Sequence, residues 1–141
     1  MKIFQKNIQL SPKKRGFHII TDVIIGKLED HLTSIQFGTL HVFIKHTSAS
    51  LTINENADFT VRQDFESHFN EMIPEDMSYY RHNYEGSDDM PAHIKSSVLG
   101  SSILIPVSNG HLNLGLWQGI YLCEHRDHAS SRHLVLTLTG E

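Results

Sequence analysis

The chain has 141 residues, a net charge of −4 and 39% hydrophobic residues, which fits one folded domain over residues 1–141. The acidic balance argues against a general nucleic-acid binder, although a local basic pocket stays compatible with it because net charge averages over the surface. The single cysteine, Cys123, excludes a disulfide framework and favours a cytoplasmic protein. No run approaches the ~20 apolar residues of a membrane helix, and the N-terminus lacks the apolar region of a signal peptide.

The first half of the chain is expected to contain four strands and two helices. Apolar residues in alternation or in short runs predict strands at residues 3–10, 16–20, 39–45 and 50–54. Thr21 and Asp22 can cap a helix whose periodic apolar residues continue to Leu32. A second helix is predicted from Asn56 to Asn70, with an apolar residue at every third or fourth position.

The second half begins with a polar, irregular stretch over residues 75–90, and a loop of this length is usually functional or disordered. Asp88 and Asp89 followed by Pro91 form a helix-start signal, so a helix is predicted over residues 91–99. Strands are predicted at residues 103–107, 111–114, 118–124 and 133–139. The order of these elements predicts an α+β fold, a single compact domain with helices packed on a largely antiparallel β-sheet.

His93 lies in the first turn of the predicted helix. The positive end of the helix dipole favours a neutral ring there, which can bind a metal or accept a proton. Ser97 lies four residues further along the same face. The free N–H groups at the helix start also suit a phosphate or a carboxylate. The alternative is that Asp88 or Asp89 only caps the helix and that His93 faces solvent.

Four other histidines could take part in a site. His82, in the preceding loop, and His46, at a strand end, could join His93 around one ion, although no standard zinc spacing connects them. The alternative is a surface His82 and a His46 whose hydrogen bonds are satisfied within the fold. His125 and His128 could chelate a metal or belong to a solvated turn.

Glu124 shares the register of core-facing residues, so its carboxylate needs a histidine, arginine or metal partner unless the strand end is exposed. The neighbouring Cys123 could act as a nucleophile. A lone cysteine in a strand is far more often a small packed residue. The chain contains no Gly-x-Ser-x-Gly elbow and no phosphate-binding glycine-rich loop.

Three long segments are HTSASLTINENAD (residues 46–58), YRHNYEGSDDMPAHIKSSVLGSS (residues 80–102) and LNLGLWQGIYLCEHR (residues 112–126). They resemble the YjbQ family, also called uncharacterised protein family 0047, and the resemblance covers essentially the whole chain. It implies a compact α+β subunit that forms a homotrimer, with a polar pocket near the subunit interface. It also implies a divalent metal, expected to be zinc, on the motif histidines His46, His82 and His93.

The same resemblance implies a weak, secondary thiamine-phosphate synthase activity and places further motif residues near the histidines. The candidate catalytic residues are Asp88, Glu124, Asn54 and Gln118. The candidates for binding a substrate anion are Lys95, Ser97 and Arg81.

The leading hypothesis is a metal-dependent enzyme, a transferase that acts on a small phosphorylated metabolite. Its ion would stabilise phosphate charge or activate water, and magnesium can accompany the substrate. Asp88 or Glu124 would orient a ligating ring or act as a base. The alternatives are a non-catalytic trimeric module that holds a metal or metabolite, and a structural trimer whose histidines bind metal only opportunistically. Neither a nucleic acid nor a membrane is an expected partner.

Overall fold

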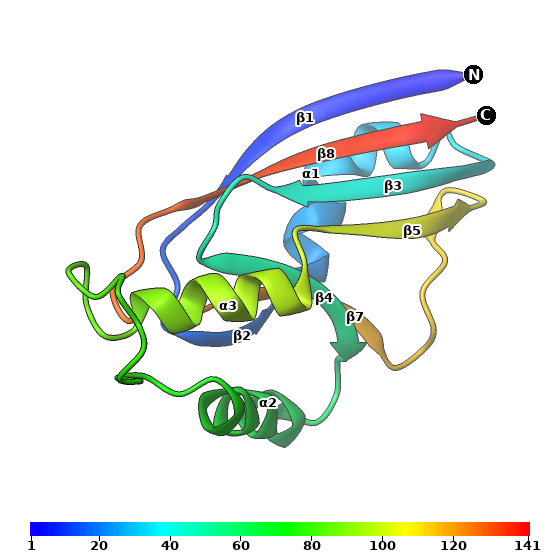
Figure 1. Cartoon of the computed structure of the whole chain (residues 1–141). Helices are drawn as coiled ribbons and strands as arrows, with labels where there is room; N and C mark the ends of the chain where they lie inside the picture. The colour runs from blue at the N-terminus through cyan, green and yellow to red at the C-terminus, as the bar shows by residue number, and fades with distance from the viewer.

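The computed structural model describes residues 1–141 and contains eight strands and three helices (Figure 1). The strands are β1 (Lys2–Leu10), β2 (Gly16–Ile19), β3 (Phe37–Ile44), β4 (Ala49–Glu55), β5 (Ser102–Ser108), β6 (His111–Leu112), β7 (Gln118–Glu124) and β8 (Arg132–Gly140). The helices are α1 (Thr21–Leu32), α2 (Phe59–Met72) and α3 (Asp89–Leu99). Every predicted element is present. None of the three helices combines the length and the apolar character needed to cross a membrane.

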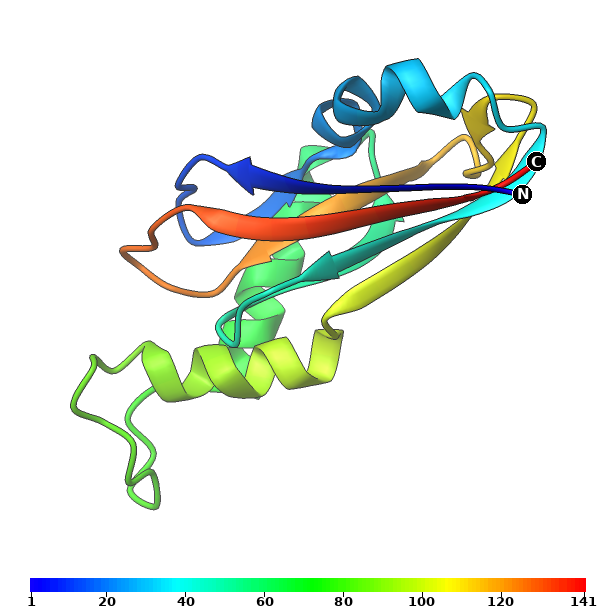
Figure 2. The same cartoon turned by 90° about the horizontal axis from the view of Figure 1, so that it is seen from above.

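Every neighbouring pair of strands is antiparallel, which confirms the predicted sheet type. The strands form a five-stranded sheet in the order β1-β8-β3-β5-β6 and a three-stranded sheet in the order β2-β7-β4. Strands β1 and β8 pair along their whole length, from Lys2 opposite Gly140 to Leu10 opposite Arg132. The two ends of the chain therefore lie side by side (Figure 2). The chain is a single α+β domain, as predicted.

The main core joins both sheets to α1. It contains 19 buried residues, among them Ile24, Leu28 and Leu32 from one stripe of α1. Their spacing of four residues places them on the same helical face, as the sequence pattern predicts. Burying one such leucine or isoleucine stabilises the fold by about 1.5–3 kcal/mol relative to leaving it exposed. This core makes the sheets and α1 one rigid support for the remaining two helices.

Helices α2 and α3 cover the other face of the three-stranded sheet, with α2 along β2 and α3 along β4. The ring of Phe17 lies under α2, and its centroid is 5.4 Å from that of Phe65 and 5.8 Å from that of Phe69.

Cys123 is fully buried beside Phe17, which confirms that it is a packed residue. Burial raises the pKa of its thiol to about 12, so it is not an activated nucleophile.

All three helix starts differ from the prediction, and α3 begins at Asp89, two residues before the predicted start. Thr21 belongs to α1 and does not cap it, because its hydroxyl accepts the N–H of Ile120 at 2.9 Å. Helix α2 begins after Asp58, whose carboxylate accepts the N–H of Thr60 at 2.9 Å, and not at Asn56. A short polar side chain bonds to whichever free N–H the fold brings nearest, and a local sequence pattern does not show which one that is.

Candidate functional site

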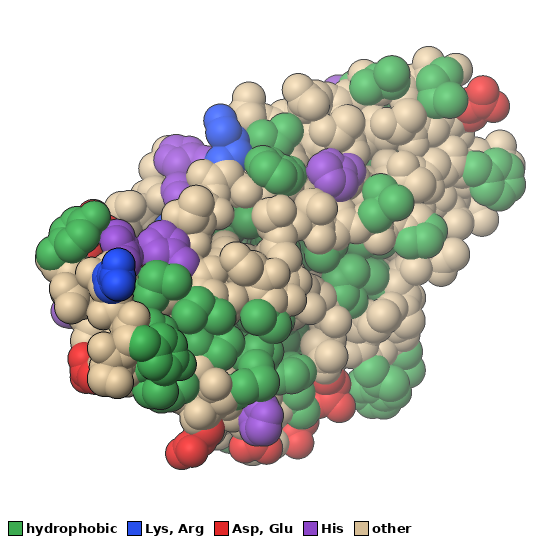
Figure 3. Space-filling view, viewed as in Figure 1, with side chains coloured by type: hydrophobic (Ala, Val, Ile, Leu, Met, Phe, Trp, Pro, Cys, Tyr) green, Lys and Arg blue, Asp and Glu red, His purple; other side chains and the backbone are tan.

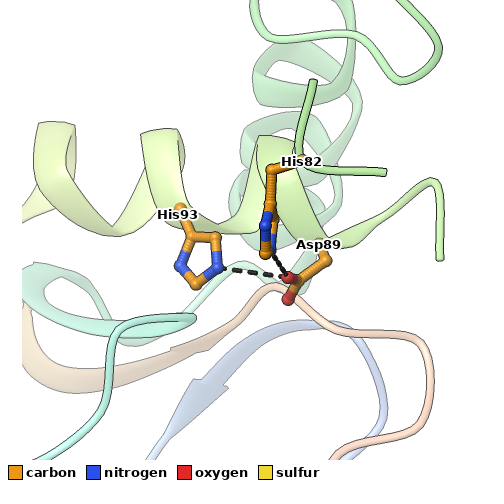
Figure 4. Close-up of side chains that lie close together, drawn as sticks. All are labelled: His82, Asp89 and His93. Carbon is orange, nitrogen blue, oxygen red and sulfur yellow. Dashed lines mark hydrogen bonds and ion pairs between the residues drawn. The ribbon is translucent and has the colours of Figure 1, made fainter. Parts of the chain in front are cut away.

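Two histidines and one aspartate meet at the beginning of α3 (Figure 4). Asp89 and His93 lie one helical turn apart, and His82 reaches them from the loop that precedes the helix. Asp89 Oδ2 is 2.6 Å from His82 Nε2 and 3.1 Å from His93 Nε2. The three ligand atoms lie within 4.8 Å of one another, a spacing that one divalent ion can bridge. We call these three residues the His–Asp cluster.

The ring of His93 is held between two acceptors. Its Nδ1 is 2.9 Å from the carbonyl oxygen of Thr47, and its Nε2 faces the carboxylate of Asp89. A carbonyl oxygen only accepts, so Nδ1 carries a proton and donates it. In the neutral ring, the Nε2 lone pair then faces a carboxylate, which is unfavourable unless a proton or a metal ion lies between them. A backbone carbonyl on the second ring nitrogen is the usual partner of a metal-binding histidine.

Arg126 fixes the carboxylates at the start of α3. Its Nη1 donates to Asp89 Oδ1 at 2.5 Å, and its Nε donates to Asp88 Oδ2 at 2.8 Å. Burial alone raises the pKa of Asp89, but the hydrogen bond from His82 and the charge of Arg126 outweigh it and lower that pKa. Asp89 is therefore ionised, with one oxygen held by Arg126 and the other facing the two histidines.

The start of α3 corrects one alternative from the sequence. Asp88 makes no side-chain cap bond, and its carboxylate accepts the N–H of Asp127 at 2.9 Å as well as the bond from Arg126. The interpretation that Asp88 or Asp89 only caps the helix is therefore wrong. Both side chains pair with Arg126 because the turn between β7 and β8 folds over the helix start.

Two small pockets border the His–Asp cluster. The first measures about 240 Å³, and its lining includes His82, Met77, Tyr80 and Met90. The second measures about 300 Å³, and its lining includes His93, His46, Thr47, Ser96, Ser97 and Ser101. Figure 3 shows histidine side chains gathered on this side of the molecule, around the beginning of α3. Each histidine of the cluster thus borders a pocket of its own, and Asp89 lines neither pocket.

His46 lies in the second pocket but outside the His–Asp cluster. Its Nε2 accepts the N–H of His133 at 2.8 Å, and the two rings stack with centroids 5.7 Å apart. Burial, followed by the charge of Arg132, lowers the pKa of His46, so the ring is neutral with its proton on Nδ1. Of the three histidines expected to share an ion, the structure brings together His82 and His93, and the third ligand atom at that point belongs to Asp89.

Glu124 is completely buried and pairs with Arg132. Its Oε1 accepts from Nε of Arg132 at 2.7 Å, and its Oε2 accepts from Nη2 at 2.6 Å. The same Nη2 donates to Ser48 Oγ at 3.1 Å. The expectation that a core-facing Glu124 needs a partner is confirmed, and the partner is an arginine. Because Ser48 follows Thr47, this pair also helps to position the carbonyl that holds His93.

His125 is buried, so the solvated-turn interpretation is wrong for this residue. Its Nε2 is 2.8 Å from the hydroxyl oxygen of Ser50. Burial, followed by the charge of Lys95, lowers the pKa of His125 to about 3, and the ring is neutral. His128 is exposed in the turn. The turn begins in the interior of the fold and ends at its surface, which explains why His125 is buried and His128 is exposed to solvent.

Two candidate catalytic residues lie far from the His–Asp cluster. Asn54 and Gln118 border a shallow pocket with Trp117 at the far end of β4 and β7. Gln118 begins β7 and Glu124 ends it, which separates them by about 20 Å at ~3.3 Å per strand residue. A single chain therefore does not bring Asn54 and Gln118 to the cluster.

The three residues expected to bind a substrate anion lie in three different places in the structure. Ser97 lines the second pocket, beside His93. Lys95 is buried and donates to Asn70 Oδ1 at 2.7 Å, and burial lowers its pKa. Arg81 is exposed in the loop before α3.

Sequence reasoning missed Asp89 as a member of the cluster, although its spacing of four residues from His93 on one helix is a usable signal.

Comparison with known proteins identifies the family. The sequence model described as UPF0047 protein YjbQ-like matches residues 6–141. UPF0047 protein YjbQ of Salmonella typhimurium is 56% identical over 138 residues, which are 98% of this chain and 99% of the relative. UPF0047 protein YugU of Bacillus subtilis is 42% identical over 120 residues, 84% of this chain and 87% of YugU.

Solved structures agree with this assignment. A YbjQ-like protein of unknown function from Sulfolobus solfataricus matches with a TM-score of 0.87 at 27% identity, over 99% of each chain. A conserved YjbQ/UPF0047 protein from Clostridium acetobutylicum matches with a TM-score of 0.83 at 34% identity, over 95% of this chain and 99% of the other. Sequence and fold together show that this chain belongs to the YjbQ-like UPF0047 family.

Proposed function

We propose that this protein is a cytoplasmic, metal-dependent enzyme that acts on a small phosphorylated substrate, with a thiamine-phosphate synthase type of transfer as its reaction. The observation that carries the proposal is the ring of His93 between the Thr47 carbonyl and the Asp89 carboxylate. A nitrogen lone pair, a carboxylate oxygen and the ring of His82 are directed to one point. One divalent cation satisfies all three groups at once.

The donor set fits zinc. Zinc takes imidazole nitrogen and carboxylate oxygen at about 2.0–2.2 Å, so the ligand atoms of a tetrahedral site lie about 3.3 Å apart. The separations of 2.6 and 3.1 Å between Asp89 Oδ2 and the two ring nitrogens are close to this value. Three protein ligands leave a fourth position open, as catalytic zinc sites do. Magnesium prefers oxygen ligands and would enter with the substrate phosphate.

The residues around the His–Asp cluster would position the substrate. When bound, the ion supplies positive charge that stabilises phosphate and a departing pyrophosphate. In the second pocket, the Nδ1–H of His46 and the hydroxyl of Ser97 can donate to phosphate oxygens. In the first pocket, Tyr80 offers ring surface to the organic part of a substrate. Because His82 lines one pocket and His93 the other, two substrates can meet at the cluster, which favours transfer over hydrolysis.

The proposal includes a homotrimer. On β1, β3, β5 and β8, none of the side chains on the face opposite the core is Lys, Arg, Asp or Glu. This sheet face exposes Ile3, Phe43 and Leu104, with exposed fractions of 67%, 39% and 63%. An uncharged surface suits contact between copies that each carry a net charge of −4. Light scattering should give three times the mass of one chain, and Leu104→Asp should lower it.

Metal content tests the ligand set. Protein purified without a histidine tag should contain about one divalent ion per chain, and His93→Ala and Asp89→Asn should lose it. His68→Ala is the matched control, because His68 is exposed on α2 and lies outside the cluster. Equal metal content in His93→Ala and His68→Ala would show that the His–Asp cluster does not hold the ion.

Turnover separates an enzyme from a binding module. The wild-type protein should form thiamine phosphate with release of pyrophosphate, and its overexpression should rescue a thiamine-requiring cell. His93→Ala should lose both effects together with the metal. Metal binding without turnover would favour the non-catalytic trimeric module. Activity that persists unchanged in His93→Ala would remove the cluster from the reaction.

A further inference from the structure

A groove outside the His–Asp cluster runs between β2 and α2, which pack side by side (Figure 1). Its volume is about 730 Å³, larger than that of either pocket at the cluster. It shares no lining residue with those two pockets. The side chains of Lys14, Phe17, Phe59, Arg62 and Asp64 are part of its lining. Its chemistry therefore belongs to a separate region of the molecule.

The groove is more basic than the chain as a whole. Arg15 and Glu66 also line it, but Arg15 is held by ion pairs with Glu66 and Asp127, both at 3.1 Å, and with Glu75 at 3.7 Å. This leaves the ammonium of Lys14 and the guanidinium of Arg62 against the exposed carboxylate of Asp64. The chain has a net charge of −4, so a local excess of positive charge is a departure from its average. Such an excess favours an anionic ligand.

Arg62 has a donor without an acceptor. Its Nη1 is the one buried side-chain polar atom of the chain that has no hydrogen-bond partner. Its guanidinium lies beside the hydroxyl of Tyr121, whose own proton goes to the carbonyl of Glu55. Buried polar groups are nearly always paired, and an unpaired N–H is destabilising. Nη1 is itself shielded from solvent, so a ligand does not reach it, but the nitrogens Nε and Nη2 of the same guanidinium are not buried. A phosphate in the groove can pair with these two nitrogens, because the guanidinium fork matches phosphate oxygens.

Phe59 adds a flat, exposed surface to the groove. It is the first residue of α2, and its exposed fraction is 60% although the side chain is large and apolar. Phe17, on β2, also lines the groove, but it is buried against α2 and leaves Phe59 as the exposed ring. Planar rings of ligands stack on aromatic side chains in this way. A cationic pair beside an exposed ring selects a ligand that has both an anionic group and a planar ring.

We infer that the groove between β2 and α2 binds a small molecule with a phosphate group and a planar ring, such as a mononucleotide. Arg62 and Lys14 pair with the phosphate, and Phe59 stacks on the ring. The ion pair between Glu66 and Arg15 keeps that carboxylate from opposing the anion. This binding site does not depend on the proposed metal centre.

Calorimetric titration of the full-length protein with adenosine 5′-monophosphate tests the site, with adenosine and inorganic phosphate as partial probes. The monophosphate should bind at least about tenfold more tightly than either partial probe, because each of them makes only one of the two contacts. Equal affinity for adenosine and the monophosphate would overturn the role of the two cations. Failure to saturate at millimolar monophosphate would overturn the site itself.

Variants locate the contacts. Arg62→Gln should weaken monophosphate binding by about tenfold, and Lys14→Gln, at an exposed loop position, gives a second test that does not disturb folding. Phe59→Ala should remove the advantage over inorganic phosphate. Lys27→Gln, at an exposed position on α1 outside the groove, is the matched control and should bind normally. Unchanged affinity in both cation variants, or a loss in His93→Ala, would overturn the assignment to this groove.

Discussion

Asp89 and His93 meet across one turn of α3, with Oδ2 and Nε2 3.1 Å apart. Residues four apart on a helix face the same side, so the helix itself sets this separation. His82 comes from a loop, and the carboxylate of Asp89 is turned towards it by the bond to Arg126. The position of His93 relative to Asp89 is therefore set by α3. The position of His82 relative to Asp89 depends on Arg126.

Arg126→Gln removes the bonds that hold Asp89 and Asp88 in place. We expect metal affinity to fall about 10–100-fold, the usual effect of losing a group that orients a ligand. Competition with a chromophoric chelator measures the Kd. Arg81→Gln, in the loop next to His82, should keep the wild-type affinity. If both variants bind equally well, Arg126 does not orient the carboxylate.

The strands were predictable and their pairing was not. Leu40, Val42 and Ile44 occupy alternate positions, and all three are buried, so a local pattern was enough to identify β3. The neighbours of β3 are β8 and β5, which come from the far half of the chain. Pairing at this distance depends on the whole core, and nothing in the period-two pattern of a strand specifies it.

The same limit explains which part of the site was predictable. His46, His82 and His93 were predicted as ligands from the resemblance to the YjbQ family, since no standard zinc spacing connects them. Asp89 was interpreted as a cap, since a carboxylate just before Pro91 suits either role. Arg126 decides between the two roles, because it pairs with the carboxylate of Asp89. Arg126 reaches α3 only because the turn after β7 folds over the start of that helix. A contact between two loops leaves no periodic signal in the sequence.

Glu124→Gln should destabilise the fold strongly. Arg132 would lose its bidentate partner while it stays buried, and breaking one side of a buried pair costs about 3–5 kcal/mol. The free energy of unfolding from urea titrations measures the effect. The double variant Glu124→Leu with Arg132→Met should recover most of it, because no charge then remains unpaired. A double variant as unstable as Glu124→Gln would mean that shape, and not charge, governs this position.

His125 should make stability depend on pH. Its pKa is about 3 in the folded chain and 6.5 as a free side chain, so the unfolded chain binds more protons between these values. The free energy of unfolding therefore falls as pH falls through this window, by up to about 1.4 kcal/mol per pH unit. His125→Gln should flatten the curve below pH ~6.5, whereas His68→Gln, at an exposed site, should not. Parallel curves for both variants would contradict the depressed pKa.

Two glycines should respond in opposite directions to alanine. Gly26 is exposed inside α1 and an added methyl meets nothing within 4 Å, so Gly26→Ala should stabilise the fold by about 0.5–1 kcal/mol. Gly38 lies on β3, where the methyl would clash with the backbone of Thr139 and come within 2.9 Å of Gly140 Cα. Backbone cannot move aside as a flexible side chain can, so Gly38→Ala should cost about 1–3 kcal/mol. Thermal unfolding should show a higher midpoint than that of the wild type for Gly26→Ala and a lower one for Gly38→Ala. A higher midpoint for Gly38→Ala would mean that β3 and β8 are less closely paired than their register indicates.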